Sequence, residues 1–242
     1  MVCALCQRSC RAGLCAACQS QVLGGAAARC PRCALRIQHE ARECGACLSQ
    51  PPAYDLTVTA VDYAAPQDML VQQLKFGGAL PLAGVCADLL TSPLMALVQP
   101  PSTQQSGGQG RALLPGGAGL PELLCPVPLG AARLAERGYN QSLEIARVLA
   151  KRLALPLAPR LLVRCRDTAP QAGLQAALRQ ANLRGAFALS PGGADQVKNR
   201  HIGVVDDVMT TGATLEEIAR VLKRHGAARV TNIVFARTAA PG

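Results

Sequence analysis

The sequence predicts an α/β protein in which a parallel sheet is flanked by helices and is preceded by a small cysteine-rich module. Two observations predict this fold class. Nine of the twelve cysteines lie within residues 1–47, and from residue 122 onward short apolar segments alternate with segments of helical periodicity. We therefore divide the 242 residues into a cysteine-rich module, residues 1–50, and a larger α/β domain, residues 54–242.

The composition is that of a folded protein with no membrane insertion. Half of the residues are hydrophobic and 17% are charged, which excludes bulk disorder. No apolar run approaches the ~20 residues of a membrane-spanning helix. Residues 1–25 also lack the pattern of a signal peptide. We expect a cytoplasmic protein, in which clustered cysteines indicate metal ligands rather than disulfides.

Eight of the N-terminal cysteines form four Cys-x-x-Cys pairs. Two such pairs complete a tetrahedral zinc site, so four pairs predict two zinc ions with a structural role. Short loops favour a sequential pairing, but an interleaved pairing also fits, and Cys10 or His39 could replace a ligand. Contact of neighbouring arginines with nucleic acid is the alternative role. The predicted metal ligands are Cys3, Cys6, Cys15, Cys18, Cys30, Cys33, Cys44 and Cys47.

The other elements follow from periodicity and breaker residues. Residues 99–121 are rich in Pro, Gly, Ser and Gln and predict a flexible insertion in the second domain. The alternation of strands and helices favours a parallel sheet that is covered on both faces. The remaining cysteines, Cys86, Cys125 and Cys165, are expected in the core. We predict strands at 54–60, 122–127, 201–205 and 229–235, and helices at 69–76, 80–97, 143–153, 174–183 and 215–222.

The most informative segment is residues 201–217. An apolar strand brings two adjacent carboxylates, Asp206 and Asp207, to its carboxyl end, and a loop rich in Thr and Gly then enters a helix. Such a loop can bind a phosphate at the positive end of the helix, and two carboxylates can accept hydrogen bonds from ribose hydroxyls. Thr214 and Glu217 have the spacing of a capping box, which does not explain two adjacent acids.

The positive charge is concentrated in the second half of the chain. The formal net charge is +10; residues 1–121 carry 8 basic and 6 acidic groups (+2), and residues 122–242 carry 17 and 9 (+8). Both a solvated basic surface and a site for an anionic ligand are compatible with this excess.

The segment VVDDVMTTGAT resembles the phosphoribosyl-pyrophosphate (PRPP) signature of type I phosphoribosyltransferases. Residues 126–129, 137–141 and 236–238, together with the paired cysteines, resemble the ComF family of competence-associated proteins, also called GntX-like. Two features depart from that family. Gly130 stands where a His is common, and residues 99–121 form a longer segment.

The resemblance implies a type I phosphoribosyltransferase fold behind a double zinc ribbon, PRPP and Mg²⁺ as ligands, and a part in DNA uptake or natural transformation. It implies that the paired acids hold the ribose hydroxyls and that the following loop wraps the 5′-phosphate. Departure of pyrophosphate from ribose C1 needs cationic stabilisation, which we assign to the segment that begins at Arg137. Residues 164–182 are expected to close over the site. The catalytic residues are then Arg137, Asp206 and Asp207, and the PRPP-binding residues are Arg137, Gly138, Tyr139, Asn140, Gln141, Asp206, Asp207, Val208, Met209, Thr210, Thr211, Gly212, Ala213 and Thr214.

Two functions remain open at this stage. The first is an enzyme that transfers phosphoribose to an acceptor and releases pyrophosphate. The second is a non-catalytic PRPP sensor whose zinc module contacts single-stranded DNA or a competence protein. The sequence identifies neither the acceptor nor the oligomeric state. It contains no motif for nucleotide hydrolysis, Rossmann redox chemistry or serine hydrolysis, which disfavours those classes.

Overall fold

The computed structural model describes residues 2–11, 13–23, 27–38, 41–98, 119–166 and 183–240. The predicted insertion, residues 99–121, is therefore described only from residue 119 onward. The predicted closing segment, residues 164–182, is described only as far as residue 166. His39 and most of the predicted helix at 174–183 lie outside the described residues.

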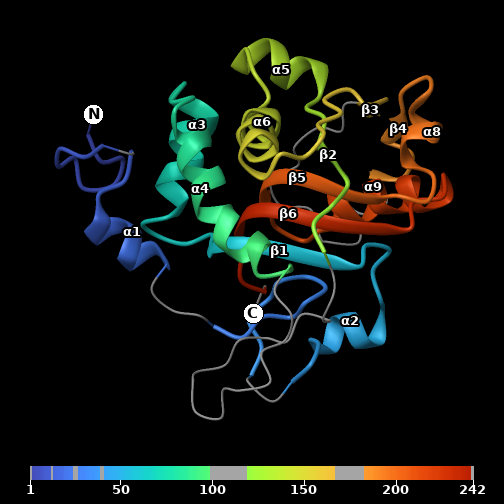
Figure 1. The fold of residues 1–242 in the computed structure, drawn as a ribbon, viewed down its shortest axis with the longest axis horizontal. Helices are drawn as coiled ribbons and strands as arrows, with labels where there is room; N and C mark the ends of the chain where they lie inside the picture. The colour runs from blue at the N-terminus through green and yellow to red at the C-terminus, as the bar shows by residue number, and fades with distance from the viewer. Residues whose placement is uncertain are drawn as a thin grey trace.

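A four-stranded parallel sheet lies at the centre of the fold (Figure 1). Its order is β1 (Leu56–Asp62), β6 (Arg229–Arg237), β5 (His201–Met209) and β2 (Leu123–Pro126). Because all three strand pairs are parallel, the carboxyl ends of the strands lie along one edge. The two central strands are buried almost throughout, as expected when both faces of a sheet are covered.

Helices α3 (Asp68–Phe76), α4 (Leu82–Met95) and α6 (Gln141–Leu153) pack together on one face of the sheet (Figure 1). The helical spacing of Ile145 and Leu149 places both side chains against this face, where each is 0% exposed. The short helix α5 (Ala131–Arg137) lies beyond α6 and buries none of its residues. It can therefore present its polar side chains to a ligand.

Helices α9 (Ala213–Arg224) and α8 (Gly193–Val197) belong to the core on the opposite face. Alternation along β6 separates the two cores, because Val234 belongs to this one whereas Ile233 and Phe235 belong to the other. A short antiparallel pair, β3 (Leu162–Arg164) with β4 (Phe187–Leu189), also packs here. The parallel sheet with helices on both faces confirms the predicted fold class.

The cysteine-rich segment contributes to both cores. Residues around α1 (Ala16–Leu23), including Cys3 and Leu14, pack with α3 and α4, and the residues around α2 (Gly45–Ser49) join the core of α9. The two halves of residues 1–50 therefore cover opposite faces of the sheet.

Several sequence predictions change in detail. Strand β5 continues to Met209, so that Asp206 and Asp207 lie within the strand rather than after it. Cys165 is exposed, so its predicted place in the core is wrong, whereas Cys86 and Cys125 are fully buried. Among the residues that the structure describes, no helix has both the length and the apolarity needed to cross a bilayer.

Candidate functional site

A cavity of about 460 Å³ opens at the carboxyl edge of the sheet, between the end of α3, the loop after β2 and strand β5. Such a volume is typical of sites for small ligands. The cavity brings together residues that lie far apart in the sequence. Of the predicted site residues, those that line it are Arg137, Gln141, Asp206, Asp207, Val208 and Thr214.

The two adjacent acids have different partners. Oδ1 of Asp206 accepts hydrogen bonds from Ser142 Oγ at 2.8 Å and from the backbone N–H of Asp207 at 2.9 Å. Asp207 is 4% exposed, and its Oδ2 lies 2.5 Å from Lys75 Nζ. Burial raises the pKa of Asp206 to about 7, and the charge of Asp207 adds to this effect, while Ser142 and Lys75 oppose it. Near neutral pH, Asp206 is therefore divided between its protonated and its charged form.

Positive charge surrounds the acids. Arg137 extends from the last turn of α5, where its Nη1 donates a hydrogen bond to Gln141 Oε1 at 2.6 Å. Its guanidinium carbon lies 5.3 Å from the centre of the Phe76 ring, a cation–π contact that holds the side chain at the cavity wall. Arg133 and Arg164 also line the cavity. These cations suit a ligand with several negative charges.

The three residues between Arg137 and Gln141 shape the wall and do not line this cavity. Gly138 ends α5 with a φ of +80°, a left-handed conformation that favours glycine. Tyr139 donates its hydroxyl to the carbonyl of Leu74, and so ties the wall to α3. Asn140 caps α6 by accepting from the N–H of Ser142 at 3.0 Å, and its Nδ2 donates to the Val127 carbonyl at 2.9 Å.

The predicted phosphate loop, residues 208–214, lies between two cavities. Val208 and Thr214 line the cavity of the acids, whereas Thr211, Gly212 and Ala213 line a second cavity of about 390 Å³. The N–H of Ala213 donates to Thr211 Oγ1 at 3.3 Å, which tightens the turn.

The predicted capping box is wrong. Gly212 is the N-cap residue of α9, so Thr214 lies inside the helix and does not act as its N-cap. Oε1 of Glu217 instead accepts a hydrogen bond from the N–H of Gly185 at 2.8 Å, which joins α9 to the segment before β4. The spacing of Thr214 and Glu217 could not reveal that the helix begins with the loop glycine.

Sequence reasoning missed three residues of the site. Lys75 and Phe76 line the cavity from α3, and Ser142 contacts Asp206 from α6. One signal was present, because Lys75 is the only Lys or Arg between Arg42 and Arg111 in the sequence. A single cation in so long a stretch without other basic residues suggests a specific partner.

Arg237, at the end of β6, lies behind the phosphate loop and is 5% exposed. Its Nη1 donates to the carbonyls of Met209 at 3.0 Å and of Thr210, and its Nε donates to the carbonyl of Cys33 at 2.8 Å. Burial lowers the pKa of Arg237, and neighbouring Cys33 and Tyr54 oppose that effect. Met209 and Thr210, two of the predicted PRPP-binding residues, are thus held by their carbonyls from the side of β6.

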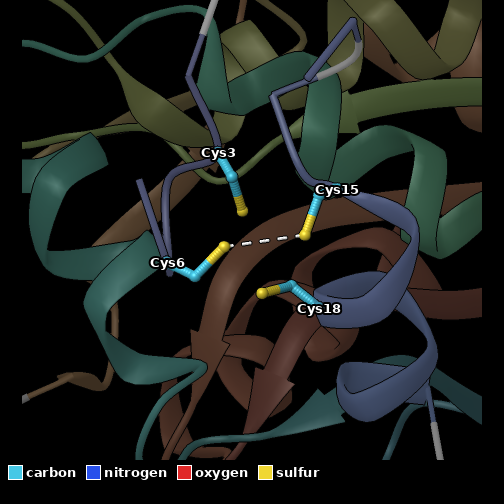
Figure 2. Close-up of side chains that lie close together, drawn as sticks. All are labelled: Cys3, Cys6, Cys15 and Cys18. Atoms are coloured by element: carbon cyan, nitrogen blue, oxygen red, sulfur yellow. Dashed lines mark hydrogen bonds between the residues drawn. The ribbon is translucent and has the colours of Figure 1, made fainter. Parts of the chain in front are cut away.

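The eight predicted metal ligands form two groups of four, in each of which the ligand atoms lie within 4.8 Å of one another: Cys3, Cys6, Cys15 and Cys18 form the first tetrad, and Cys30, Cys33, Cys44 and Cys47 form the second. The grouping is the sequential one, not the interleaved one. Figure 2 shows the four sulfurs of the first tetrad directed toward a common centre. Cys10 belongs to neither tetrad.

The sulfur spacing fits a zinc ion. The Sγ atoms of Cys6 and Cys15 are 3.6 Å apart, and those of Cys33 and Cys44 are 3.5 Å apart. Tetrahedral zinc with bonds of ~2.3 Å separates its sulfur ligands by ~3.8 Å. Two groups of four cysteines with this spacing can hold two zinc ions.

Both tetrads have the same local plan. Each begins with a turn whose ends form an antiparallel bridge, Val2 with Ser9 and Arg29 with Arg36. The residue after the second cysteine has a positive φ, 61° at Gln7 and 58° at Ala34. The third cysteine of each tetrad directly precedes a helix.

Three of the arginines near the cysteines are engaged in ion pairs. Arg29 Nη1 lies 2.8 Å from Asp62, Arg36 pairs with the same carboxylate, and Arg32 Nε lies 2.9 Å from Glu43. The two pairs with Asp62 connect the second tetrad to β1. The pair of Arg32 with Glu43 connects the first half of the tetrad to its second half. They also reduce the positive charge available for the alternative role in nucleic-acid binding.

Comparison with known proteins places this architecture in a family. The family model of the phosphoribosyl transferase domain matches residues 140–241. The chain is 37% identical to DNA utilization protein YhgH of Escherichia coli O157:H7 over 86% of this chain and 84% of that protein. It is 34% identical to competence protein F of Haemophilus influenzae over 81% of this chain and 79% of that protein.

The chain belongs to the ComF family. The ComF resemblance predicted from the sequence motifs is thereby confirmed, as is the phosphoribosyltransferase fold of the α/β part. Among solved structures, the chain is similar to glutamine PRPP amidotransferase from B. subtilis complexed with ADP and GMP. That similarity has 20% identity and a TM-score of 0.33, over 48% of this chain and 23% of the other.

Proposed function

We propose that this ComF-family protein binds PRPP with Mg²⁺ in the cavity of the paired acids and transfers its phosphoribosyl group to an acceptor. One observation carries the proposal. Asp206 and Asp207, on β5, share a cavity of about 460 Å³ with Arg137, on α5. A diol-binding pair and a cation for a leaving group thus face one space large enough for a phosphorylated sugar.

The roles of the residues follow from their contacts. The ribose hydroxyls donate to Asp206 and Asp207, which Ser142 and Lys75 hold in position. The 5′-phosphate accepts hydrogen bonds from amides and hydroxyls of residues 208–214 at the start of α9. Arg137 contacts the pyrophosphate, supported by Phe76.

Catalysis on this arrangement requires no protein nucleophile. The bond from ribose C1 to the pyrophosphate oxygen breaks, and its electron pair leaves with the pyrophosphate. A lone pair of the acceptor forms the new bond to C1, and the proton that the acceptor loses passes to water. When bound together with PRPP, Mg²⁺ would neutralise part of the charge of the leaving group. The protein residues orient the sugar and stabilise the departing anion.

Calorimetry and product analysis test the proposal. PRPP with Mg²⁺ should bind, and pyrophosphate should be released when a suitable base or amine from a panel is present. Asp206→Asn combined with Asp207→Asn should weaken binding at least about tenfold, because two charged acceptors are lost. Asp195→Asn, an exposed residue of α8, is the matched control. Binding without turnover across the panel would favour the sensor, and absence of binding would overturn the proposal.

We further propose that this activity serves the handling of DNA in the cytoplasm, with DNA or a competence protein as the partner. The names of the two relatives support this assignment. A bacterium that lacks its own copy of the gene provides the test. The unaltered chain should restore transformation or growth on DNA, and the double Asn variant should not.

A further inference from the structure

We propose that Arg237 is a positioning residue through which the second cysteine tetrad holds the phosphate loop in its binding shape. The inference rests on the function proposed above, since it concerns the loop assigned to the 5′-phosphate. Arg237 would touch neither substrate nor metal. It acts through the backbone of both elements.

The contacts of the guanidinium define this link. Nε donates to the carbonyl of Cys33, a residue of the second tetrad, at 2.8 Å. Nη1 lies within hydrogen-bond distance of the carbonyls of Met209, Thr210 and Thr238. One planar, buried cation therefore joins a turn of the cysteine module to the first residues of the phosphate loop.

A second set of contacts surrounds the same link. The cavity of about 390 Å³ is lined by Cys33 and Cys47 on one side and by residues 211–213 on the other, with Arg237 in its wall. Tyr54 is 5% exposed in that wall, and a Cβ atom added to Gly212 would lie 3.3 Å from its hydroxyl. The tetrad and the loop thus face each other across a small space that Arg237 bridges.

The direction of the effect follows from the carbonyl of Cys33. A metal ion on its sulfur restricts the turn around Cys33, and so restricts the carbonyl to which Arg237 donates. Loss of the ion releases that carbonyl, and the guanidinium is then held only by the carbonyls of the loop and of Thr238. The loop carbonyls share a donor that is no longer fixed, so the loop exchanges among more conformations.

The first tetrad provides an internal control. It belongs to the core of α3 and α4 on the opposite face of the sheet, whereas the second tetrad belongs to the core of α9. Both tetrads have the same local plan and the same kind of ligands. Only the second should therefore affect the phosphate loop.

Hydrogen exchange of the ligand-free protein tests the positioning role. Arg237→Lys keeps the charge but cannot reach both the Cys33 carbonyl and the loop carbonyls, so amides of residues 210–214 should exchange about tenfold faster. Both zinc ions and the exchange of α4 should be unchanged. Arg220→Lys, which alters another arginine of the same cavity wall, is the matched control. Unchanged exchange of the loop in Arg237→Lys would overturn the proposal.

The metal dependence is tested in the same way. Cys44→Ser should accelerate exchange of the loop, and Cys15→Ser in the first tetrad should not. An equal effect of both variants would overturn the specific link. If Cys44→Ser unfolds the protein, the comparison of Arg237→Lys with Arg220→Lys decides alone.

Reciprocity supplies a further readout, because any coupling of two sites acts in both directions. In the Cys15→Ser protein, which retains the second site, PRPP with Mg²⁺ should slow zinc release to a chromogenic chelator severalfold. In the Cys44→Ser protein it should not. Adding Arg237→Lys to Cys15→Ser should abolish the slowing.

The two proposals can fail separately. If PRPP does not bind in calorimetry while exchange of the ligand-free loop still depends on Arg237, the positioning role stands and the proposed ligand is wrong. If PRPP binds but neither loop exchange nor zinc release depends on Arg237, the positioning role is overturned and the proposed function stands.

Discussion

Lys75 on α3 and Asp207 on β5 form an ion pair, with Nζ 2.5 Å from Oδ2. The pair joins a helix of one face of the sheet to the strand that carries the site. It also gives the less exposed of the two acids a counter-charge, so that the acids can remain adjacent. The stability of the fold and the charge of the site therefore depend on the same contact.

Lys75→Met should lower the free energy of unfolding by about 2 kcal/mol, because it leaves the Asp207 carboxylate buried without its counter-charge. The cost should shrink when Asp207→Asn is added, since the buried charge is then also removed. Urea denaturation at neutral pH measures both effects. Arg147→Met removes an exposed pair with Glu144 and should change stability by less than about 0.5 kcal/mol. Equal costs for the two single variants would contradict this account.

Stability should depend on pH through Asp206. Its pKa is raised from 3.8 to about 7 in the folded protein, so folding favours the protonated acid. The contribution is complete below about pH 4 and is lost as pH rises through about 7. Asp206→Asn should remove this dependence. As pH rises from about 5 to about 8, the free energy of unfolding of the variant should therefore increase by about 1–2 kcal/mol relative to that of the unaltered chain. Denaturant titrations at both pH values measure this difference. If the free energy of unfolding changes equally with pH in the two proteins, the role of Asp206 is ruled out.

Gly212→Ala should destabilise the protein and weaken PRPP binding. Gly212 has a φ of +82°, and an added Cβ would lie 2.6 Å from Met209 Cε. Gly192→Ala separates the cost of the positive φ from the cost of the steric contact. Gly192 has a φ of +74°, but nothing lies within 4 Å of an added Cβ. We expect a cost of about 1 kcal/mol for Gly192→Ala and a larger one for Gly212→Ala. Thermal unfolding and calorimetry measure them, and indistinguishable variants would show that the loop accommodates a side chain.

Elemental analysis should find about two zinc ions per chain, and about one in each of Cys15→Ser and Cys44→Ser. Cys10→Ser should retain the full content, because Cys10 belongs to neither tetrad. A loss of zinc in Cys10→Ser, or a fully folded protein without metal, would contradict the assignment of the ligands.

The sequence identifies those parts of the fold that depend on local pattern. Strand β5, helix α9 and strand β6 are recognisable from apolar periodicity, and the cysteine spacing identifies the ligands of both tetrads. Helices α1 and α2 cannot be predicted in this way, because they are positioned by their cysteines and not by an apolar stripe. Strands β3 and β4 have three residues each, too few to show a period.

The site is predictable only in part for a related reason. The acids and the loop stand together in the chain, and so form a motif. Lys75 and Ser142 meet them through the packing of α3 and α6 against the sheet. The contacts of Arg237 depend on where β6 ends relative to β5 and to the turn at Cys33, which no single segment encodes.

The placement of the cysteine tetrads on opposite sides of the sheet limits how the chain can be shortened. Each tetrad packs apolar side chains of its own against a different layer of helices. A fragment that begins at residue 54 would thus expose hydrophobic surface on both sides of the sheet and would tend to aggregate. Expression of the α/β domain should therefore include the amino-terminal residues, even if the metal has no part in the chemistry.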